Sequence, residues 1–321
     1  MNTILATTNA CVKGFSQSQL ERYFARIGKC PKWSIHSDYC LGDPNKPNDV
    51  AVFTLVPYVA DIGELNRLVG GKLKSDLKRK RQIGQEEIAC LNSELFFHFA
   101  FVMSKRRYIF SQSKGDSEKK RMHEAVLVTQ RMLRGWISDE KVNQEFALGL
   151  LDKLARLEPR LAAGSANLKL LKNIFLISAL GASIAGILAE LAGARLIGWL
   201  SDRDSIIRAQ DGLAFDCFHM GFSGLAEMTK QNWDEVKLVY ANPSEHSPDG
   251  TWYDALNRLP DHLAGALADF SFSDAQSSTE KAHQVLISCI TNRARVAVHR
   301  LTTDPGAFAC DGIEFGLTPF S

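Results

Sequence analysis

Short runs of apolar, β-branched and aromatic residues alternate with turn-forming residues through the first hundred positions. Such runs occupy residues 33–38 and 50–58, and the segment between them, residues 42–49, is rich in Gly, Asp, Asn and Pro. Runs of this length bounded by turn formers are typical of β-strands. The pattern therefore predicts a β-hairpin. A third strand is expected at residues 95–103, where a helix is the alternative.

Helical spacing of apolar residues prevails in the middle of the chain. A short helix is expected over residues 61–69, closed by the two glycines that follow it. Apolar residues recur at helical spacing through residues 117–156, with a break near Ser138 where a helix N-cap fits, so two helices are expected there. The uncharged segment 174–189 predicts a further apolar helix that ends near Gly193.

Both kinds of pattern occur in the last third of the chain. Strand-length runs lie at residues 195–200 and 236–240, and helices are expected at 212–230, at 260–270 and, as a last long helix, at 279–301. The mixture of strands and helices places the chain in the α/β or α+β class.

The segment 174–189 also raises the question of a membrane span. It is shorter than the roughly 20 apolar residues that a span needs, and it contains Ser178, Gly181, Ser183 and Gly186. A buried core helix is therefore the favoured interpretation, and no membrane partner is expected. The alternative is a protein that meets the membrane through this segment.

The composition narrows the class of protein. With 321 residues, 45% hydrophobic and 23% charged, the chain is neither a disordered tail, a fibre nor a disulfide-stapled miniprotein. Its seven cysteines are scattered without a C-x-x-C pair, and the N-terminus lacks the basic start and continuous apolar stretch of a signal peptide. We therefore expect reduced thiols and a cytoplasmic location.

Two common kinds of site are disfavoured. The chain contains neither of the glycine-rich phosphate-binding motifs that mark ATP or NAD sites. Cys30, His36 and Cys40 could be imagined as zinc ligands, but no second pair of ligands at suitable spacing completes a tetrahedral set.

Carboxylates at the ends of buried elements are the residues most suggestive of chemistry. Asp38 is expected at the end of the first strand, and Asp202 and Asp204 follow the strand at 195–200. Asp261 follows Pro260 and precedes a run of small residues, so it is expected in the first turn of a helix that lies close on the sheet.

This order of carboxylates resembles the ribonuclease H-like superfamily, which includes integrases, transposases and Holliday-junction resolvases. The similarity is greatest to a branch of uncharacterised members whose first strand ends Asp-Glu-Ser-Gly and whose last motif is an Asp before small residues. It covers roughly residues 30–300 as architecture, and its motifs are single carboxylates. Here Asp38 is followed by Tyr39-Cys40-Leu41-Gly42, so a helper carboxylate beside Asp38 is missing.

The resemblance implies an α/β fold: a ribonuclease H-like mixed β-sheet flanked by helices. The whole chain, residues 1–321, would then form a single domain with an inserted helical region at about 115–193. It also implies that Asp38 is a bridging metal ligand, with Asp202 and Asp261 as the other catalytic ligands and Asp204 as an alternate for Asp202. Two Mg²⁺ or Mn²⁺ ions need several oxygen ligands from different elements, and these side chains provide them.

Glu94 is a fourth candidate ligand, but a solvated acid at the end of a helix is the favoured interpretation, because exposed acids are common. The carboxylates also have structural explanations: Asp38 as a turn cap, Asp202 as a helix N-cap and Asp261 as a first-turn acid that complements the helix dipole.

A basic segment lies between residues 72 and 134. It carries fifteen Lys and Arg against seven Asp and Glu, so the near-neutral total of +2 conceals a local excess of positive charge. A nucleic-acid backbone is the partner that this charge favours, and a solvated helical face is the alternative. The residues expected to contact it are Lys78, Arg79, Lys80, Arg81, Lys105, Arg106 and Arg107.

The sequence thus favours a divalent-metal-dependent nuclease that hydrolyses phosphodiester bonds of DNA or RNA. The alternative is a catalytically inactive ribonuclease H-like component that binds nucleic acid or protein, since the helper carboxylate is missing. A homo-oligomer or a protein partner remains open in either case.

Overall fold

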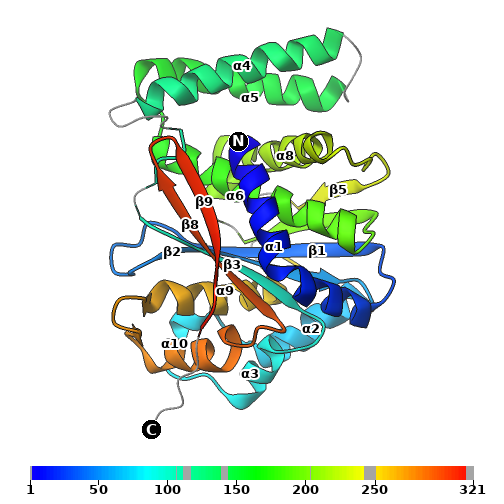
Figure 1. The fold of residues 1–321 in the computed structure, drawn as a ribbon, viewed down its shortest axis with the longest axis vertical. Helices are drawn as coiled ribbons and strands as arrows, with labels where there is room; N and C mark the ends of the chain where they lie inside the picture. The colour runs from blue at the N-terminus through cyan, green and yellow to red at the C-terminus, as the bar shows by residue number, and fades with distance from the viewer. Residues whose placement is uncertain are drawn as a thin grey trace.

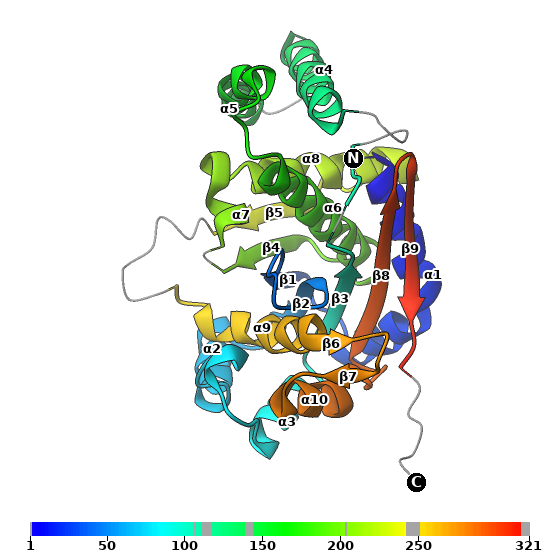
Figure 2. The ribbon, with the colours of Figure 1, turned by 90° about the vertical axis from the view of Figure 1, so that its left-hand side faces the viewer.

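The computed structural model describes residues 2–105, 107–110, 117–138, 144–202, 204–241 and 251–315. A seven-stranded mixed sheet lies between two layers of helices (Figures 1 and 2). This arrangement confirms the expected α/β class with a mixed sheet flanked by helices.

The first five strands of the sheet form one continuous set. They are β1 (Lys32–Cys40), β2 (Asp49–Pro57), β3 (Phe97–Met103), β4 (Leu196–Ser201) and β5 (Lys237–Tyr240). The order across the sheet is β5-β4-β1-β2-β3. Strands β1, β2 and β3 form an antiparallel meander, whereas β4 runs parallel to β1 and β5 runs parallel to β4.

Two further strands extend the sheet beyond β3. Strand β8 (Val296–Asp304) pairs parallel to β3, and β9 (Ala307–Ile313) pairs antiparallel to β8. A separate two-stranded hairpin is formed by β6 (Phe270–Ser271) and β7 (Gln276–Ser277).

One face of the sheet is covered by α1 (Asn2–Ile27), α6 (Leu168–Leu191) and α8 (Leu213–Thr229). The short α7 (Ser205–Arg208) and the 3₁₀ turn η2 (Ala209–Asp211) lead into α8. Helices α4 (Glu118–Ser138) and α5 (Gln144–Ala163) pack on one another and extend away from the sheet (Figure 1). Of the expected helical insertion, only these two helices lie outside the sheet layers, because α6 is part of the core.

The other face is covered chiefly by α9 (Asp254–Asp269), which lies across β1 and β2. Four short elements pack around it: α2 (Ile62–Lys72), α3 (Gln85–Leu91), α10 (Glu280–Val285) and the 3₁₀ turn η1 (Leu77–Arg79). A π-helical turn, η4 (Leu286–Ile290), continues α10.

Alternation along the buried strands creates the two cores. In β3, Phe97, Phe99 and Phe101 face α1 and α6, whereas Ala100 and Val102 face α9. Successive side chains of a strand point to opposite faces, so a strand covered on both sides is apolar at nearly every position. The helix alternative for this segment is therefore wrong.

The hairpin and the strands at 195–200 and 236–240 are confirmed within a residue or two. The two helices expected over 117–156 are confirmed as elements, with α4 ending at Ser138, but α5 runs from Gln144 to Ala163, seven residues beyond the expected end. The apolar segment 174–189 forms the centre of α6. This helix is long and apolar enough to cross a membrane, but 78% of its most apolar window is buried inside the protein. This burial agrees with the interpretation of the segment as a core helix.

Three expectations near the ends of elements are wrong. The glycines at 70 and 71 lie inside α2 and do not close it. The helix expected to begin at Pro260 begins at Asp254. The long helix expected at 279–301 ends by Ile290, and its second half is strand β8, because Val296 and Val298 pair with β3 and belong to the core that α9 covers.

Candidate metal centre

The register of β1 and β4 brings the first two predicted carboxylates to the same edge of the sheet. These strands are parallel, and Ser37 lies opposite Ser201. Asp38 and Asp202 each follow one of these two serines, so both lie at the same level of the sheet. Asp38 is still paired with Val52 of β2, two residues before the end of β1, so the turn-cap explanation for it is wrong. The serine hydroxyls are hydrogen-bonded at 3.1 Å, and the indole of Trp199 donates to Ser37 at 2.9 Å. This buried network fixes the strand ends that carry the two carboxylates.

Helix α9 carries Asp261, the third predicted carboxylate, and is hydrogen-bonded through Asn257 to strands β1 and β4. The amide of Asn257 on α9, in the orientation that satisfies both of its ends, donates to Leu200 O and accepts from the backbone N–H of Asp202 at 3.1 Å. The same amide meets Nδ1 of His36 at 2.9 Å, and burial lowers the pKa of that histidine to about 4. A neutral His36 therefore accepts this hydrogen bond without placing a charge beneath the site.

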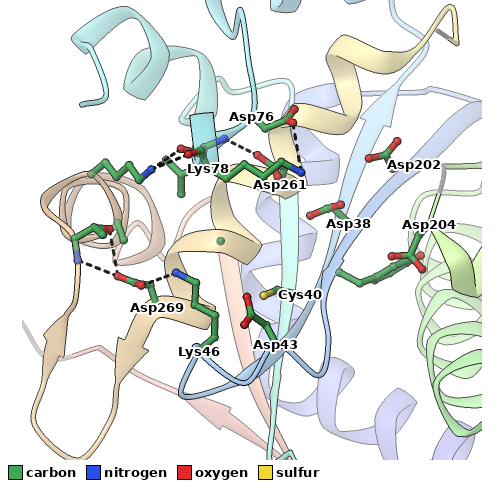
Figure 3. A pocket seen from close by; sticks show the side chains of 16 residues that line it. Asp38, Cys40, Asp43, Lys46, Asp76, Lys78, Asp202, Asp204, Asp261 and Asp269 are labelled. Atoms are coloured by element: carbon green, nitrogen blue, oxygen red, sulfur yellow. Dashed lines mark hydrogen bonds and ion pairs between the residues drawn. The ribbon is translucent and has the colours of Figure 1, made fainter. Parts of the chain in front are cut away.

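All four aspartates that the sequence singled out line one pocket of about 470 Å³: Asp38, Asp202, Asp204 and Asp261. Figure 3 shows their carboxylates around a common space, with Asp76 next to Lys78 and Asp261. Glu94 is not among them, because it pairs with Arg26 and Arg295 elsewhere. Three aspartates that the sequence did not single out also line the pocket: Asp43, Asp76 and Asp269.

Negative charge accumulates in this pocket. Burial raises the pKa of Asp38 well above its usual value, and the charges of Asp261, Asp202 and Asp204 raise it further. The pKa of Asp261 rises to about 6, mainly through burial, with Asp76 and Asp202 adding to the effect. Among the described residues, no lysine or arginine forms an ion pair with Asp38. A cation placed among these oxygens would relieve both the burial and the repulsion.

Two of the aspartates that line the pocket also stabilise the local structure through caps, ion pairs and hydrogen bonds. Asp204 is the N-cap of α7 and accepts from the backbone N–H of Ile206 at 2.6 Å through Oδ1. Asp269 is fully engaged by Lys46 at 2.6 Å and by the hydroxyls of Ser278 and Thr279. The first-turn explanation for Asp261 is wrong, because this residue lies about two turns inside α9. The capping role suggested for Asp202 belongs to Asp204.

The departure from the Asp-Glu-Ser-Gly motif has a structural consequence. Tyr39, at the position of the missing glutamate, points to the opposite face of the sheet, where its hydroxyl bonds to Ser37 and Ser201. Cys40 lines the pocket, but burial raises the pKa of its thiol to about 11, so it is neutral at physiological pH. Asp76, which precedes the basic run Lys78-Arg79-Lys80-Arg81, adds a carboxylate from another segment.

The basic run lies next to the pocket because Asp261 holds it there. Asp261 Oδ2 accepts from the backbone N–H of Leu77 at 2.7 Å, and the side chain of Lys78 lies along the pocket wall (Figure 3). Lys78 is 75% exposed, and its contact with Asp76 is loose, at 3.8 Å. It is the member of the run best placed to meet a ligand in the pocket.

The other residues predicted to contact nucleic acid differ in their exposure. Arg79, Arg81 and Lys105 are exposed, whereas Lys80 is largely buried in an ion pair with Glu87. Arg106 lies outside the described residues. Arg107 was expected at a nucleic-acid surface, and this expectation is wrong: its guanidinium is buried and paired with Asp49, and it donates to Asn173 at 2.8 Å.

The pocket has the donor chemistry for a hard divalent cation, and its carboxylates surround a space without converging on one point. Among the described residues, the group that brings three potential ligand atoms within 4.8 Å of one another is Cys11, His299 and Cys310, on the opposite side of the sheet. Aspartate oxygens suit Mg²⁺ or Mn²⁺. The residues able to share such ions are Asp38, Asp202, Asp204 and Asp261, with Asp76 at the margin.

Comparison of the chain with models of protein families, with curated proteins and with solved structures finds no match.

Proposed function

We propose that this protein is a divalent-metal-dependent nuclease of the ribonuclease H-like kind. The observation that supports this most is the shared pocket: aspartates from β1, from the end of β4 and from α9 all line it. The first and last of these residues, Asp38 and Asp261, lie more than two hundred positions apart along the chain, and the resemblance implies that all of them are ligands. The hairpin, the parallel pairing of β4 with β1 and the helix across them agree with the order that the resemblance implies.

In this proposal, Asp38, Asp202, Asp204 and Asp261 would hold the divalent ions, and Asp38 is the carboxyl that senses the charges of the other three. Ions about 3.5–4 Å apart supply the activation of a water molecule and stabilise the leaving oxygen of a phosphodiester. The chain supplies ligands from opposite walls of the pocket, which fits a pair of ions better than a closed cage around one ion. Burial raises the pKa values of Asp38 and Asp261, and the neighbouring carboxylates raise them further.

Basic residues at the rim of the pocket would bind the phosphate backbone of the substrate. Lys78 extends along the wall, and Arg79 and Arg81 are exposed next to it. Because Asp261 also anchors Leu77, the metal ligand and the basic run are held in one fixed relation. A phosphate bound by Lys78 would therefore lie close to the carboxylates.

The test is cleavage of single- and double-stranded DNA and RNA in Mg²⁺, in Mn²⁺ and in EDTA. We expect cleavage in the presence of either metal, none in EDTA, and a loss of at least about 100-fold in Asp261→Asn, since a missing ligand removes several kcal/mol of transition-state stabilisation. Asparagine retains an oxygen that accepts from Leu77, so the fold is expected to persist. Asp234→Asn, at an exposed position outside the pocket, serves as the matched control and should cleave like the wild type.

Metal-dependent cleavage that survives in Asp261→Asn would rule out this site. If neither metal supports cleavage of any substrate while nucleic acid still binds in a salt-sensitive manner, the protein is instead the inactive binding component.

Substitution of Lys78 by alanine is expected to weaken binding of nucleic acid without changing the melting temperature. Its side chain is 75% exposed, so little packing is lost. Loss of one phosphate contact should reduce the slope of log affinity against log salt by about one. Lys29→Ala, an exposed lysine outside this pocket, should leave the slope unchanged. Titrations of a fluorescent oligonucleotide at several salt concentrations measure the slope, and equal slopes for the two variants would contradict the role of Lys78.

A further inference from the structure

Three soft metal ligands meet on the face of the sheet opposite the carboxylate pocket. Cys11 comes from α1, His299 from β8 and Cys310 from β9, and their sulfur and nitrogen atoms all lie within 4.8 Å of one another. Figure 2 shows α1 running alongside β8 and β9 at the edge of the molecule. The ring of His299 is fully buried, whereas the two cysteines are half-buried.

The three ligand atoms are close enough together to share one ion, and the Cys11–His299 distance equals that expected in a tetrahedral zinc site. With Zn–S near 2.3 Å and Zn–N near 2.0–2.1 Å, two ligands of a tetrahedral zinc are about 3.5 Å apart. Cys11 Sγ and His299 Nδ1 are 3.5 Å apart. Two thiolates and one imidazole form a donor set that prefers Zn²⁺ to the hard ions suited to the aspartate pocket.

The histidine is held in place by contacts that do not depend on a metal. Its ring stacks on Phe101 at a centroid distance of 5.4 Å and meets the edge of Phe15 at 5.6 Å. The hydroxyl of Ser16 lies 3.4 Å from Nε2, which leaves Nδ1 facing the thiols. Gly312, opposite His299 in the ladder, is required for this packing, because a Cβ there would come within 2.0 Å of the Phe15 ring. Such outer contacts orient a metal-binding imidazole.

The two thiols lie within reach of one another as well as of the imidazole of His299. Cysteine binds a metal as its thiolate, so binding of an ion here would release protons from Cys11 and Cys310.

We propose that Cys11, His299 and Cys310 bind one Zn²⁺ ion, with water as the fourth ligand, and that this ion ties α1 to the strand pair β8–β9. The site is independent of the proposed nuclease centre. Its ligands lie on the opposite face of the sheet, and it would remain if the carboxylate pocket proved to be inactive.

The experiment uses the full chain, purified under reducing conditions, stripped of metal and then titrated with Zn²⁺ or Co²⁺. We expect one zinc per chain by elemental analysis, a thiolate-to-Co²⁺ charge-transfer band, and a rise in melting temperature with Zn²⁺. Cys11→Ser and Cys310→Ser should each abolish the band and the rise. Cys90→Ser, at a half-buried cysteine on α3, is the matched control, and Asp38→Asn should also retain the zinc signals.

A second measurement needs no variant and applies even if the serine substitutions impair folding. Alkylation of the wild-type protein, followed by peptide mass mapping, should show that Zn²⁺ protects Cys11 and Cys310 but leaves the labelling of Cys90, which lies outside both proposed metal sites, unchanged. Equal labelling of Cys11 with and without Zn²⁺, or a charge-transfer band that survives in both serine variants, would overturn the assignment.

Discussion

Replacement of Asp38 by asparagine is expected to abolish metal-dependent cleavage and, in EDTA, to stabilise the fold. The pKa of Asp38 is raised by burial and by Asp261, Asp202 and Asp204, so its charged form is destabilising when no cation is present. Neutral asparagine of the same shape removes that repulsion. With one bridging ligand lost, the rate should fall by roughly 1000-fold or more, which corresponds to about 4 kcal/mol of lost transition-state stabilisation.

The stability effect has a defined pH dependence. A carboxyl whose pKa is higher in the folded state favours folding when it is protonated, and that contribution is lost as the pH rises through the folded pKa. For Asp261 the window runs from 3.8 to about 6, and the raised pKa of Asp38 adds a further loss of the same sign. Without metal, wild-type stability should therefore decline over this range, and Asp38→Asn should decline less.

Melting curves in EDTA and in Mg²⁺ across this pH range provide the measurement. At pH 7.5 in EDTA we expect Asp38→Asn to melt about 2 °C above the wild type, the shift that about 1 kcal/mol produces in a chain of this size. Mg²⁺ should raise the melting temperature of the wild type but not that of the variant. A variant that melts well below the wild type in EDTA, or that still responds to Mg²⁺, would show that Asp38 is a structural residue and not a ligand.

Substitution of Arg107 by alanine is expected to destabilise the protein by about 3–5 kcal/mol, the usual cost of removing one partner from a buried ion pair. Arg107 and Asp49 are both almost fully buried, and Asp49 also accepts from the backbone N–H of Gly42 at 2.7 Å. Without the guanidinium, Asp49 remains as an uncompensated charge at the start of β2. Urea unfolding measures the loss, and Arg79→Ala, an exposed position, should change the stability by less than about 0.5 kcal/mol.

A double variant separates the ion pair from packing. Asp49→Asn removes the stranded charge while keeping the acceptor for Gly42, so Arg107→Ala combined with Asp49→Asn should be more stable than Arg107→Ala alone. Affinity for nucleic acid, measured on the folded fraction, should be unchanged in both. If Arg107→Ala lost affinity for nucleic acid while its stability stayed normal, Arg107 would be a nucleic-acid contact and the structural role would be wrong.

Local patterns were informative wherever one kind of periodicity dominated. The turn formers at 42–49 predicted the hairpin, and β-branched and aromatic residues predicted β3. The prediction for segment 279–301 was wrong, because its apolar residues are compatible both with one long helix and with the short helix followed by a strand that forms. Pairing with β3 decided between the two, since a strand beside a buried edge gains a full ladder of hydrogen bonds that a local pattern does not reveal.

The first helix was not predicted, although a signal existed. Its buried positions recur at helical spacing, but Thr8, Asn9 and Ser16 lie among them and obscure the apolar stripe. Polar residues at buried positions are uncommon, so a pattern based on hydrophobicity loses sensitivity there. This helix carries Cys11, and the zinc proposal therefore could not have been reached from the sequence. The set that the spacing did suggest is not assembled: Cys30 donates to a backbone carbonyl, and His36 binds Asn257.

Local hydrophobicity and turn residues determined the approximate strand and helix boundaries near the candidate carboxylates but not their exact places, since Asp38 lies two residues before the end of β1 and Asp261 lies about two turns inside α9. The tertiary structure decided that Asp38, Asp202, Asp204 and Asp261 share a pocket, that Asp76 joins them and that Arg107 turns inward. Convergence of this kind depends on strand order, on register and on the packing of α9 across β1. These are contacts between residues far apart in the chain, and local periodicity contains no information about them.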